Sequence, residues 1–285
     1  MILEISRLAI SLDSPHEVMQ TVNFKDFIKG NQKPDYIVEL TPTEELSFAM
    51  ENVVYSDVDY CVCWKKEQFL RYYFHPRCQD IIYAKSCWDW KEKRITVEYV
   101  PQYQEFLSES GNALFHIGLE QIMLREQRLI FHAACVDTVY GGILFTGPAG
   151  AGKSTQADLW IKHRDAFLIN GDRPILSVDE NGWKAWGSPY AGSSRCYVNK
   201  CCDLKSIVRV VQDSENKVVR LKGSRAFSTV FSGVTVNDWS REDVCMASEL
   251  VIQLINTIPV YEMHCTKTEE AVEILEDVLK GEMNL

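Results

Sequence analysis

The sequence lacks any apolar run long enough to cross a membrane, since no stretch approaches the roughly 18 consecutive apolar residues that a membrane helix needs. Residues Met1 to Arg7 contain charges and no long apolar segment, so they predict no signal peptide. The sequence also lacks a surplus of positive charge, because its 285 residues carry a formal net charge of -10. Nucleic acids and membrane surfaces are polyanionic, so this charge argues against both as partners.

The usual spacing of a cysteine metal site is also absent, although the chain has ten cysteines. The nearest arrangement is Cys61-x-Cys63 with Cys78 and Cys87. Residues two apart lie on one face of a strand, which favours buried thiols over a metal site. A long chain without an export signal is typical of a reducing compartment, so we expect reduced thiols and a cytoplasmic protein.

Residues 1–110 are predicted to form a β-rich accessory domain. Short β-branched and aromatic runs recur at roughly ten-residue spacing and are separated by Asp, Asn, Gly and Pro, which is typical of an antiparallel sheet. The aromatic residues Trp64, Trp88 and Trp90 fit sheet packing better than a ligand platform. The predicted strands include Leu8, Ile10 and Leu12, followed by Tyr36–Leu40, Tyr60–Trp64, Leu70–Phe74 and Ile95–Val100.

Residues 111–285 are predicted to form a second domain of α/β class. Pro101 and the small polar residues 108–112 mark the boundary. A helix over Ala113–Arg128, a buried strand over Leu129–Val136 and a hairpin turn at Val139–Gly142 lead into a strand that ends at Thr146. The later predicted elements are a strand over Ala166–Asn170, a hairpin over Ile175–Trp186, a helix over Glu249–Ile258, a strand over Val260–Cys265 and an amphipathic helix after the capping box Thr266–Glu269.

The most informative stretch follows the strand that ends at Thr146 and precedes a segment that can wind as a helix. It reads Gly147-Pro148-Ala149-Gly150-Ala151-Gly152-Lys153-Ser154-Thr155 and matches G-x-x-x-x-G-K-S, the Walker A or P-loop pattern. Its glycines let successive N–H groups point at a polyphosphate, and the helix start adds the positive end of its dipole. Lys153 can then reach the β- and γ-phosphates, and the Ser154 hydroxyl is placed to ligate Mg²⁺. All nine residues are therefore predicted to bind ATP, whereas a glycine-rich turn without a ligand is the alternative.

Two further side chains are candidates for chemistry beside this loop. Asp172 follows a predicted buried strand, and strand ends are where nucleotide-binding α/β proteins place a metal ligand or a base. Asp172 could hold Mg²⁺ or deprotonate an acceptor hydroxyl, or it could be a turn residue before Arg173-Pro174. His132 lies in an apolar strand that a hairpin could set beside the loop, or it could be a packed core histidine.

Two more stretches have functional and structural interpretations. The loop Gly187–Ser194 is rich in Gly and Ser, so it could line an active site or only connect strands. From Arg195 to Arg225 there are eight basic and three acidic residues, a local balance of +5. Such a stretch could attract a phosphate or an acidic acceptor, although scattered solvated lysines and arginines have the same pattern.

From Leu129 onward the chain resembles the HPr kinase/phosphorylase-like group, whose nucleotide core is shared with phosphoenolpyruvate carboxykinases. The matching residues are His132, the Gly147–Ser154 loop, Gly171-Asp172-Arg173 and the Gly187–Ser194 loop. The last of these resembles divergent HPr kinase-like proteins that are often encoded near peptide-modification genes. In HPr kinases this strand end carries two adjacent acids, whereas here Gly171 precedes Asp172.

The resemblance implies a P-loop kinase domain of the HPr kinase/phosphoenolpyruvate carboxykinase-like type behind a β-rich accessory or acceptor-recognition domain. It implies Mg²⁺-dependent transfer of the γ-phosphate of ATP to a hydroxyl, a serine of a protein or peptide. By this resemblance Lys153 would bind the phosphate, Ser154 would ligate the metal, His132 would lie near the transferred group, and Asp172 would be the base. The position of Asp172 at a strand end makes it the second candidate metal ligand. A nucleotide switch or ATPase without acceptor chemistry and a small-molecule kinase stay open, as does a homo-oligomer.

Overall fold

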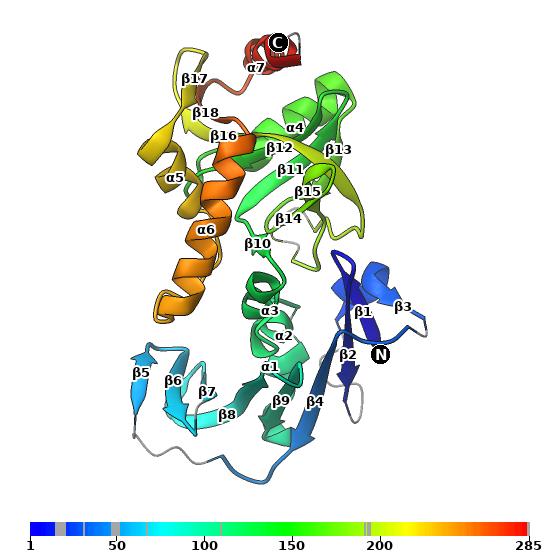
Figure 1. The fold of residues 1–285 in the computed structure, drawn as a ribbon, viewed down its shortest axis with the longest axis vertical. Helices are drawn as coiled ribbons and strands as arrows, with labels where there is room; N and C mark the ends of the chain where they lie inside the picture. Colours follow the sequence, from blue (N-terminus) through cyan, green and yellow to red (C-terminus); the bar gives the residue numbers. More distant parts are fainter. Residues whose placement is uncertain are drawn as a thin grey trace. The chain divides into compact units, whose positions relative to one another are not determined.

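The computed structural model describes residues 1–14, 21–30, 32–46, 52–66, 68–108, 110–190, 192 and 195–283. The protein is a mixed α/β chain with two large sheets (Figure 1). Its contacts divide it into two compact units, Met1–Leu119 and Glu120–Leu285. None of the helices in the described ranges combines the length and apolar composition that a membrane crossing requires.

The first unit is built on a sheet whose strands lie in the order β3-β1-β2-β4-β9-β8-β7-β6-β5. Strand β4 runs parallel to both β2 and β9, whereas the other pairs are antiparallel. The expectation of a purely antiparallel sheet is therefore wrong at β4, because the chain reaches and leaves this strand by crossovers rather than hairpins. The strands are β1 (Ile2–Ile5), β2 (Leu8–Asp13), β3 (Ile28–Lys29), β4 (Tyr36–Pro42), β5 (Val53–Ser56), β6 (Tyr60–Lys65), β7 (Gln68–His75), β8 (Cys78–Asp89) and β9 (Arg94–Tyr99).

Helix α2 (Ser110–His116), which follows α1 (Glu105–Ser108), is bound at its end by side chains of β8. Ser86 Oγ donates to the carbonyl of His116 at 2.6 Å, and Trp88 Nε1 donates to that of Ile117 at 3.0 Å. The last carbonyls of a helix have no partner inside it, so these bonds complete the hydrogen bonding of α2. They hold α2 to the first sheet, and the first unit accordingly extends to residue 119 rather than to the predicted boundary after residue 110.

The predicted helix over Ala113–Arg128 is wrong as a single helix, because the chain forms α2 and then α3 (Leu119–Arg125). Gly118 lies between them with a φ of +66°, and a Cβ added there would lie 2.5 Å from Trp88 Nε1. A left-handed residue without space for a side chain has to be glycine, and such a residue commonly ends a helix. The apolar periodicity is therefore shared by two short helices.

The sheet of the second unit has the strand order β10-β14-β15-β16-β12-β11-β13, and β18 pairs with both β16 and β17. Strands β12, β16 and β18 run parallel, and β11 lies antiparallel between β12 and β13. The carboxyl ends of β12, β13, β16 and β18 therefore share one edge of the sheet with the amino end of β11. The strands are β10 (Arg128–Ile130), β11 (Ala133–Thr138), β12 (Gly141–Thr146), β13 (Phe167–Asn170), β14 (Ile175–Asp179), β15 (Gly182–Trp186), β16 (Cys201–Gln212), β17 (Lys217–Leu221) and β18 (Val260–Cys265).

Helices cover both faces of this second sheet (Figure 1). Helices α4 (Lys153–Arg164) and α7 (Glu269–Met283) pack on one face, where Trp160 lies in one core cluster with Ile143 and Phe145. Helices α5 (Gly223–Phe231) and α6 (Arg241–Thr257) pack on the other, where Val230 lies in a second cluster with Leu144. Successive residues of β12 alternate between the clusters, as the period of a strand requires.

The apolar run Leu129–Val136 forms two strands rather than the single strand predicted. Strand β10 pairs with β14, whereas β11 pairs with β12 and β13. Between them the N–H of Phe131 donates to the Pro174 carbonyl at 3.0 Å, and the N–H of His132 donates to the Gly233 carbonyl at 2.7 Å. The chain therefore changes strand neighbours at His132, which lies at the edge of the sheet rather than inside a strand.

The structure confirms the predicted hairpins β11–β12 and β14–β15, strands β13 and β18, and the last helix α7. Helix α6 begins at Arg241, before the predicted start at Glu249, because the Ser240 hydroxyl caps it by accepting the Asp243 N–H at 3.2 Å. Strands β16 and β17 and helix α5 were not predicted from the sequence. Cys61 and Cys63 are buried thiols, as predicted.

Candidate active site

A glycine-rich loop, residues 147–152, connects the end of β12 to the start of α4. Gly147, Gly150 and Gly152 have φ angles of +143°, +78° and +102°. Residues with side chains rarely adopt these angles, so the three glycines permit the turn, as the sequence predicts. Space is also limited at Gly147, where an added Cβ would lie 3.2 Å from the Val210 carbonyl oxygen.

Side chains bind the carbonyl groups of this loop. Lys153 Nζ donates to the carbonyl oxygens of Gly147 at 2.9 Å and Pro148 at 3.2 Å, and Gln212 Nε2 donates to that of Gly150 at 2.6 Å. In the part of the chain that the structure describes, no side chain caps the amino end of α4, whose first N–H groups have no partner within the helix. The amino end of α4 is thus open to an anion.

The remaining loop residues leave the backbone accessible because their side chains are small. Ala149 is exposed, and Ala151 donates its N–H to the Pro148 carbonyl at 3.1 Å. Ser154 is exposed in the first turn of α4, and Thr155 is half-buried beside it. The nine residues predicted to hold a nucleotide therefore form one continuous loop and helix start.

The register of the strands brings His132 and Asp172 to this loop. Ala133, the first residue of β11, pairs with Thr146, the last residue of β12, so His132 lies at the level of the loop. Strand β13 lies on the other side of β11, and the Ala133 N–H donates to the Asp172 carbonyl at 2.9 Å. The structure therefore confirms that the hairpin places His132 beside the loop strand.

Three ionisable groups act on one another at this edge of the sheet. His132 Nε2 lies 3.9 Å from Asp172 Oδ1. Burial lowers the pKa of His132 below its usual 6.5, Lys153 and Arg173 lower it further, and Asp172 opposes them. The imidazole is thus neutral at pH 7, and its approach to Asp172 is not an ion pair. Burial also lowers the pKa of Lys153, a shift that the Asp172 carboxylate opposes.

A buried asparagine, which the sequence analysis does not single out, positions Asp172. Asn170 Oδ1 accepts the N–H groups of Asp172 at 2.9 Å and Arg173 at 2.7 Å. Its Nδ2 donates to the carbonyls of Tyr190 at 2.8 Å and Ser188 at 3.2 Å. One side chain therefore fixes both the turn that carries Asp172 and the loop after β15. An asparagine at a strand end before a turn is the sequence signal that could have identified it.

The loop predicted either to line the site or to connect strands lies against Asp172. Ser188 Oγ donates to the Arg173 carbonyl at 2.5 Å. Gly192 has a φ of +48°, and a Cβ added there would lie 2.8 Å from Asp172 Cβ. Ala191, Ser193 and Ser194, which belong to the same predicted loop, lie outside the described residues. The described part of the loop therefore packs against the turn that holds Asp172.

Asp172 and Ser154 are the residues predicted to bind Mg²⁺. The Asp172 side chain keeps 27% of its surface exposed, and its Oδ2 lies 3.7 Å from Arg173 Nε. Within the described residues, no group of three or more His, Cys, Asp or Glu side chains could hold a metal ion without other ligands. Proteins commonly hold Mg²⁺ by one or two carboxylates together with phosphate oxygens and waters. One carboxylate and one hydroxyl fit that arrangement.

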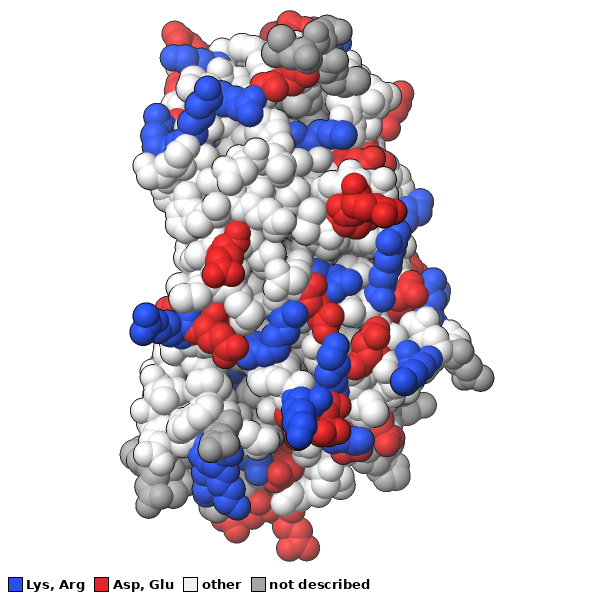
Figure 2. Space-filling view, viewed as in Figure 1, with Lys and Arg blue, Asp and Glu red and all other residues white. Residues whose placement is uncertain are grey.

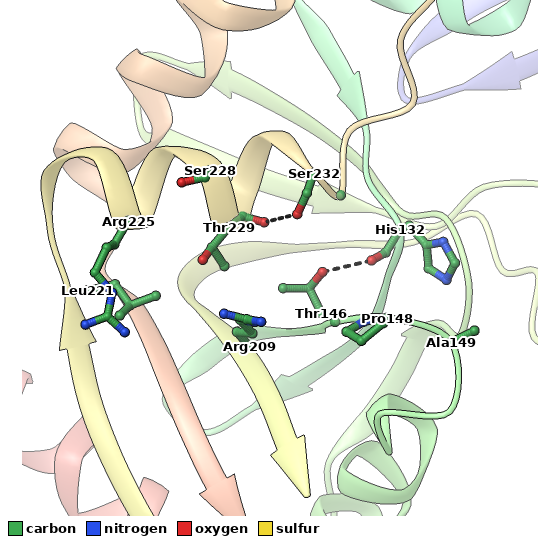
Figure 3. Close-up of a pocket in the computed structure, with 12 residues that line it drawn as sticks. His132, Thr146, Pro148, Ala149, Arg209, Leu221, Arg225, Ser228, Thr229 and Ser232 are labelled. Carbon is green, nitrogen blue, oxygen red and sulfur yellow. Dashed lines mark hydrogen bonds between the residues drawn. The ribbon is translucent and has the colours of Figure 1, made fainter.

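A pocket of about 590 Å³ lies between the glycine-rich loop and α5. Figure 3 shows His132 and Arg225 at opposite ends of this pocket, with Arg209 between them. Ser228 and Thr229 of α5 line it, together with Ser232 directly after this helix. Sequence reasoning missed these residues as site residues, because neither α5 nor the pairing of β16 with β12 was predicted.

The basic stretch that the sequence indicates is not one continuous patch. Arg209 and Arg225 line the pocket, whereas Arg220 bonds to Glu282 and Lys200 lies over the Phe167 ring. On the face shown in Figure 2, Lys and Arg side chains are interspersed with Asp and Glu. The local surplus of positive charge therefore reaches the site through two arginines only, among the residues that line the pocket.

Comparisons with known proteins leave the family of the chain open. No protein-family model matches it, and no curated protein matches it either.

Proposed function

We propose that the protein is a Mg²⁺-dependent phosphotransferase that moves the γ-phosphate of ATP to the hydroxyl of a serine in a protein or peptide. This is the activity implied by the resemblance to HPr kinase-like proteins, in a second unit of the P-loop kinase type. The reduced thiols and the acidic composition suit a cytoplasmic protein that binds neither nucleic acid nor membrane.

One observation carries the proposal: three chain segments that are separate in sequence supply complementary groups to one edge of a sheet. The loop after β12 offers N–H groups and the Lys153 ammonium, which suit a polyphosphate. The turn after β13 offers the Asp172 carboxylate, and the start of β11 offers the neutral His132. A glycine-rich turn with a purely structural role would not require the Asp172 carboxylate and the His132 imidazole beside it.

The proposed roles follow from the chemistry of these groups. Lys153, which in this structure bonds to loop carbonyls, would turn to the β- and γ-phosphates. Asp172 accepts the proton of the acceptor hydroxyl while the hydroxyl oxygen bonds to the γ-phosphorus. The bond between the γ-phosphorus and the oxygen that bridges it to the β-phosphate breaks, and ADP leaves with that electron pair. Neutral His132 offers an N–H to the transferred group. Mg²⁺, held by Ser154 and Asp172, would neutralise the developing charge.

Transfer from ATP labelled on its γ-phosphate tests the proposal. The full chain is incubated with labelled ATP, Mg²⁺ and candidate serine peptides, beside the variants Lys153→Ala and Lys162→Ala. Lys162 is the matched control, because it is an exposed lysine in the last turn of the same helix. We expect label on a peptide with the wild type and Lys162→Ala, and none with Lys153→Ala.

Other outcomes identify the rival functions. Release of free phosphate without a labelled peptide would point to an ATPase or nucleotide switch, and label on a small alcohol would point to a small-molecule kinase. Full transfer by Lys153→Ala would remove the glycine-rich loop from the mechanism.

A further inference from the structure

The pocket between the loop and α5 borders the proposed phosphate site directly. His132, Gly147, Pro148 and Ala149 form part of its wall. A molecule bound in it would therefore lie against the loop that holds the nucleotide phosphates in the proposed function. Its volume of about 590 Å³ falls within the roughly 300–1,000 Å³ of ordinary ligand pockets. The pocket thus has the size and position of an acceptor site.

The charge of this pocket is unbalanced toward the positive. Arg209 Nη1 lies 2.9 Å from Glu262 Oε2, and Arg225 Nη2 lies 3.3 Å from Glu262 Oε1. Two guanidinium groups therefore share one carboxylate, which leaves one positive charge uncompensated. His264 Nε2 also lies 3.5 Å from Glu262 Oε1. Within a chain of net charge -10, this surplus is local.

The two arginines differ in what they border. Arg209 also lines a smaller hollow formed with Pro148, Gly150 and Gln212 beside the glycine-rich loop, so it is placed to contact a nucleotide phosphate as well. Arg225 lines only the larger pocket of these two. Its side chain is 68% exposed, and an exposed ion pair at 3.3 Å is weak enough to exchange for another carboxylate. Arg225 is therefore placed to contact an acceptor in the larger pocket and not a phosphate of the nucleotide.

Neutral groups complete the pocket. Ser228 Oγ donates to the Ser224 carbonyl at 2.5 Å, and Ser232 Oγ donates to the Thr229 carbonyl at 3.0 Å. Because both hydroxyl hydrogens are used within the helix, the oxygens keep lone pairs that can accept N–H groups of a peptide backbone. Leu221 adds an apolar contact. The wall formed by α5 thus suits a short peptide better than a phosphate ion alone.

We infer that this pocket binds the acceptor, and that the acceptor is a peptide serine with an Asp or Glu side chain beside it, recognised by Arg225 with Arg209. This inference rests on the proposed function and names the substrate class of the same site. Guanidinium groups bind carboxylates through charge-assisted, often bidentate hydrogen bonds, so an acidic neighbour would set the serine against the loop.

The test measures binding, so it does not depend on turnover. Two short fluorescein-labelled serine peptides differ only in the two residues that flank the serine, which are Asp in one and Asn in the other. Their fluorescence anisotropy is titrated with the full chain in the presence of Mg²⁺ and a non-hydrolysable ATP analogue. The variants are Arg225→Gln and the control Arg220→Gln, an exposed arginine that also bonds to a glutamate but lies outside the pocket. Affinity for a fluorescent ATP analogue is measured separately.

We expect the wild type and Arg220→Gln to bind the Asp peptide about tenfold or more tightly than the Asn peptide, because Asn keeps an acceptor oxygen but lacks the negative charge that strengthens the bonds to Arg225. Arg225→Gln should bind both peptides equally and keep its affinity for the ATP analogue. Equal binding of the two peptides by the wild type would overturn the inference, as would an Arg225→Gln variant that loses the ATP analogue instead of the peptide.

Two outcomes separate this inference from the proposed function. A wild type that prefers the Asp peptide but does not bind the ATP analogue would retain the acidic-peptide site and overturn the kinase proposal. Displacement of the Asp peptide by an equal concentration of glycerate, a small hydroxy acid, would retain the carboxylate site and overturn its assignment to a peptide.

Discussion

Asn170 provides the most direct test of how the candidate site is held together. Asn170→Ala removes the acceptor for the N–H groups of Asp172 and Arg173, together with the donor for the carbonyls of Tyr190 and Ser188. The variant should therefore loosen the turn that carries Asp172 and the neighbouring loop at once. We expect losses of both stability and transfer, whereas a residue that served only the fold would affect stability alone.

The magnitude follows from the four bonds within 3.2 Å that Asn170 makes at a fully buried position. A hydrogen bond contributes about 1 kcal/mol net, and a buried group left without a partner costs about 1–3 kcal/mol. Water can reach the half-buried turn residues and recover part of the loss. The free energy of unfolding should therefore fall by about 2–4 kcal/mol.

Urea denaturation followed by circular dichroism measures this change, and Asn181→Ala is the control because Asn181 lies in the exposed turn between β14 and β15. The control should stay within about 0.5 kcal/mol of the wild type. Asn170→Asp adds a second arm, since it keeps an acceptor for Asp172 but removes both donors and buries a charge. A loss below about 0.5 kcal/mol for Asn170→Ala would refute the positioning role.

Three further predictions concern the same edge of the sheet. Asp172→Asn should slow transfer by about 100- to 10,000-fold while binding of a fluorescent ATP analogue is unchanged; an unchanged rate would make Asp172 a turn residue. The pKa of His132, followed by NMR, should lie below 6.5 and should rise in Lys153→Ala. Because the folded-state pKa is lowered, the stability that neutral His132 provides is present above pH 6.5 and is lost as the pH falls through the folded-state pKa. A measured pKa of 6.5 or more would contradict this prediction. Gly187→Ala would place a Cβ 1.8 Å from the Val198 carbonyl oxygen, so unfolding in urea should show a loss of about 3 kcal/mol, and a loss below about 1 kcal/mol would mean that the backbone can move aside.

Much of the second unit could be predicted from the sequence because its signals are local. Strand β12, the glycine-rich loop and the start of α4 are adjacent in sequence, and each is marked by residues that allow few conformations. The hairpin that sets His132 beside the loop is encoded by two apolar runs and a short turn. Asp172 follows directly from its position after a buried strand.

The residues that sequence analysis missed depend on long-range pairing. Arg209 reaches the site because it pairs with Thr146 across β12 and β16, and Arg225 reaches it through the packing of α5. Neither contact has a periodic signature. The sequence does not predict a positioning role for Asn170, because a polar residue at a strand end is commonly on the surface. In the structure Asn170 is fully buried.

The errors in the first unit have a similar origin. Alternation along β4 indicates a strand with one buried face, but not the direction of its neighbours, so the parallel pairings with β2 and β9 were missed. The break at Gly118 was missed because one glycine inside an apolar helical pattern is often tolerated. Only the position of the Trp88 ring makes that glycine a helix end.

Strand β16 also bears on when the protein becomes competent during synthesis. It pairs with β12, β15 and β18, and each of these belongs to a different group of strands: β12 with β11 and β13, β15 with β14 and β10, and β18 with β17. In the described sheet the three groups share no other strand pairing. The β11–β12 hairpin closes over a short turn, whereas pairing Gly142 with Leu204 requires a long chain segment to be closed first, which slows folding. Gln212, which holds the Gly150 carbonyl, arrives with that same strand. A nascent chain should therefore carry the complete glycine-rich motif well before the proposed nucleotide site is assembled, and the delay ends only when β16 has left the ribosome and joined the sheet.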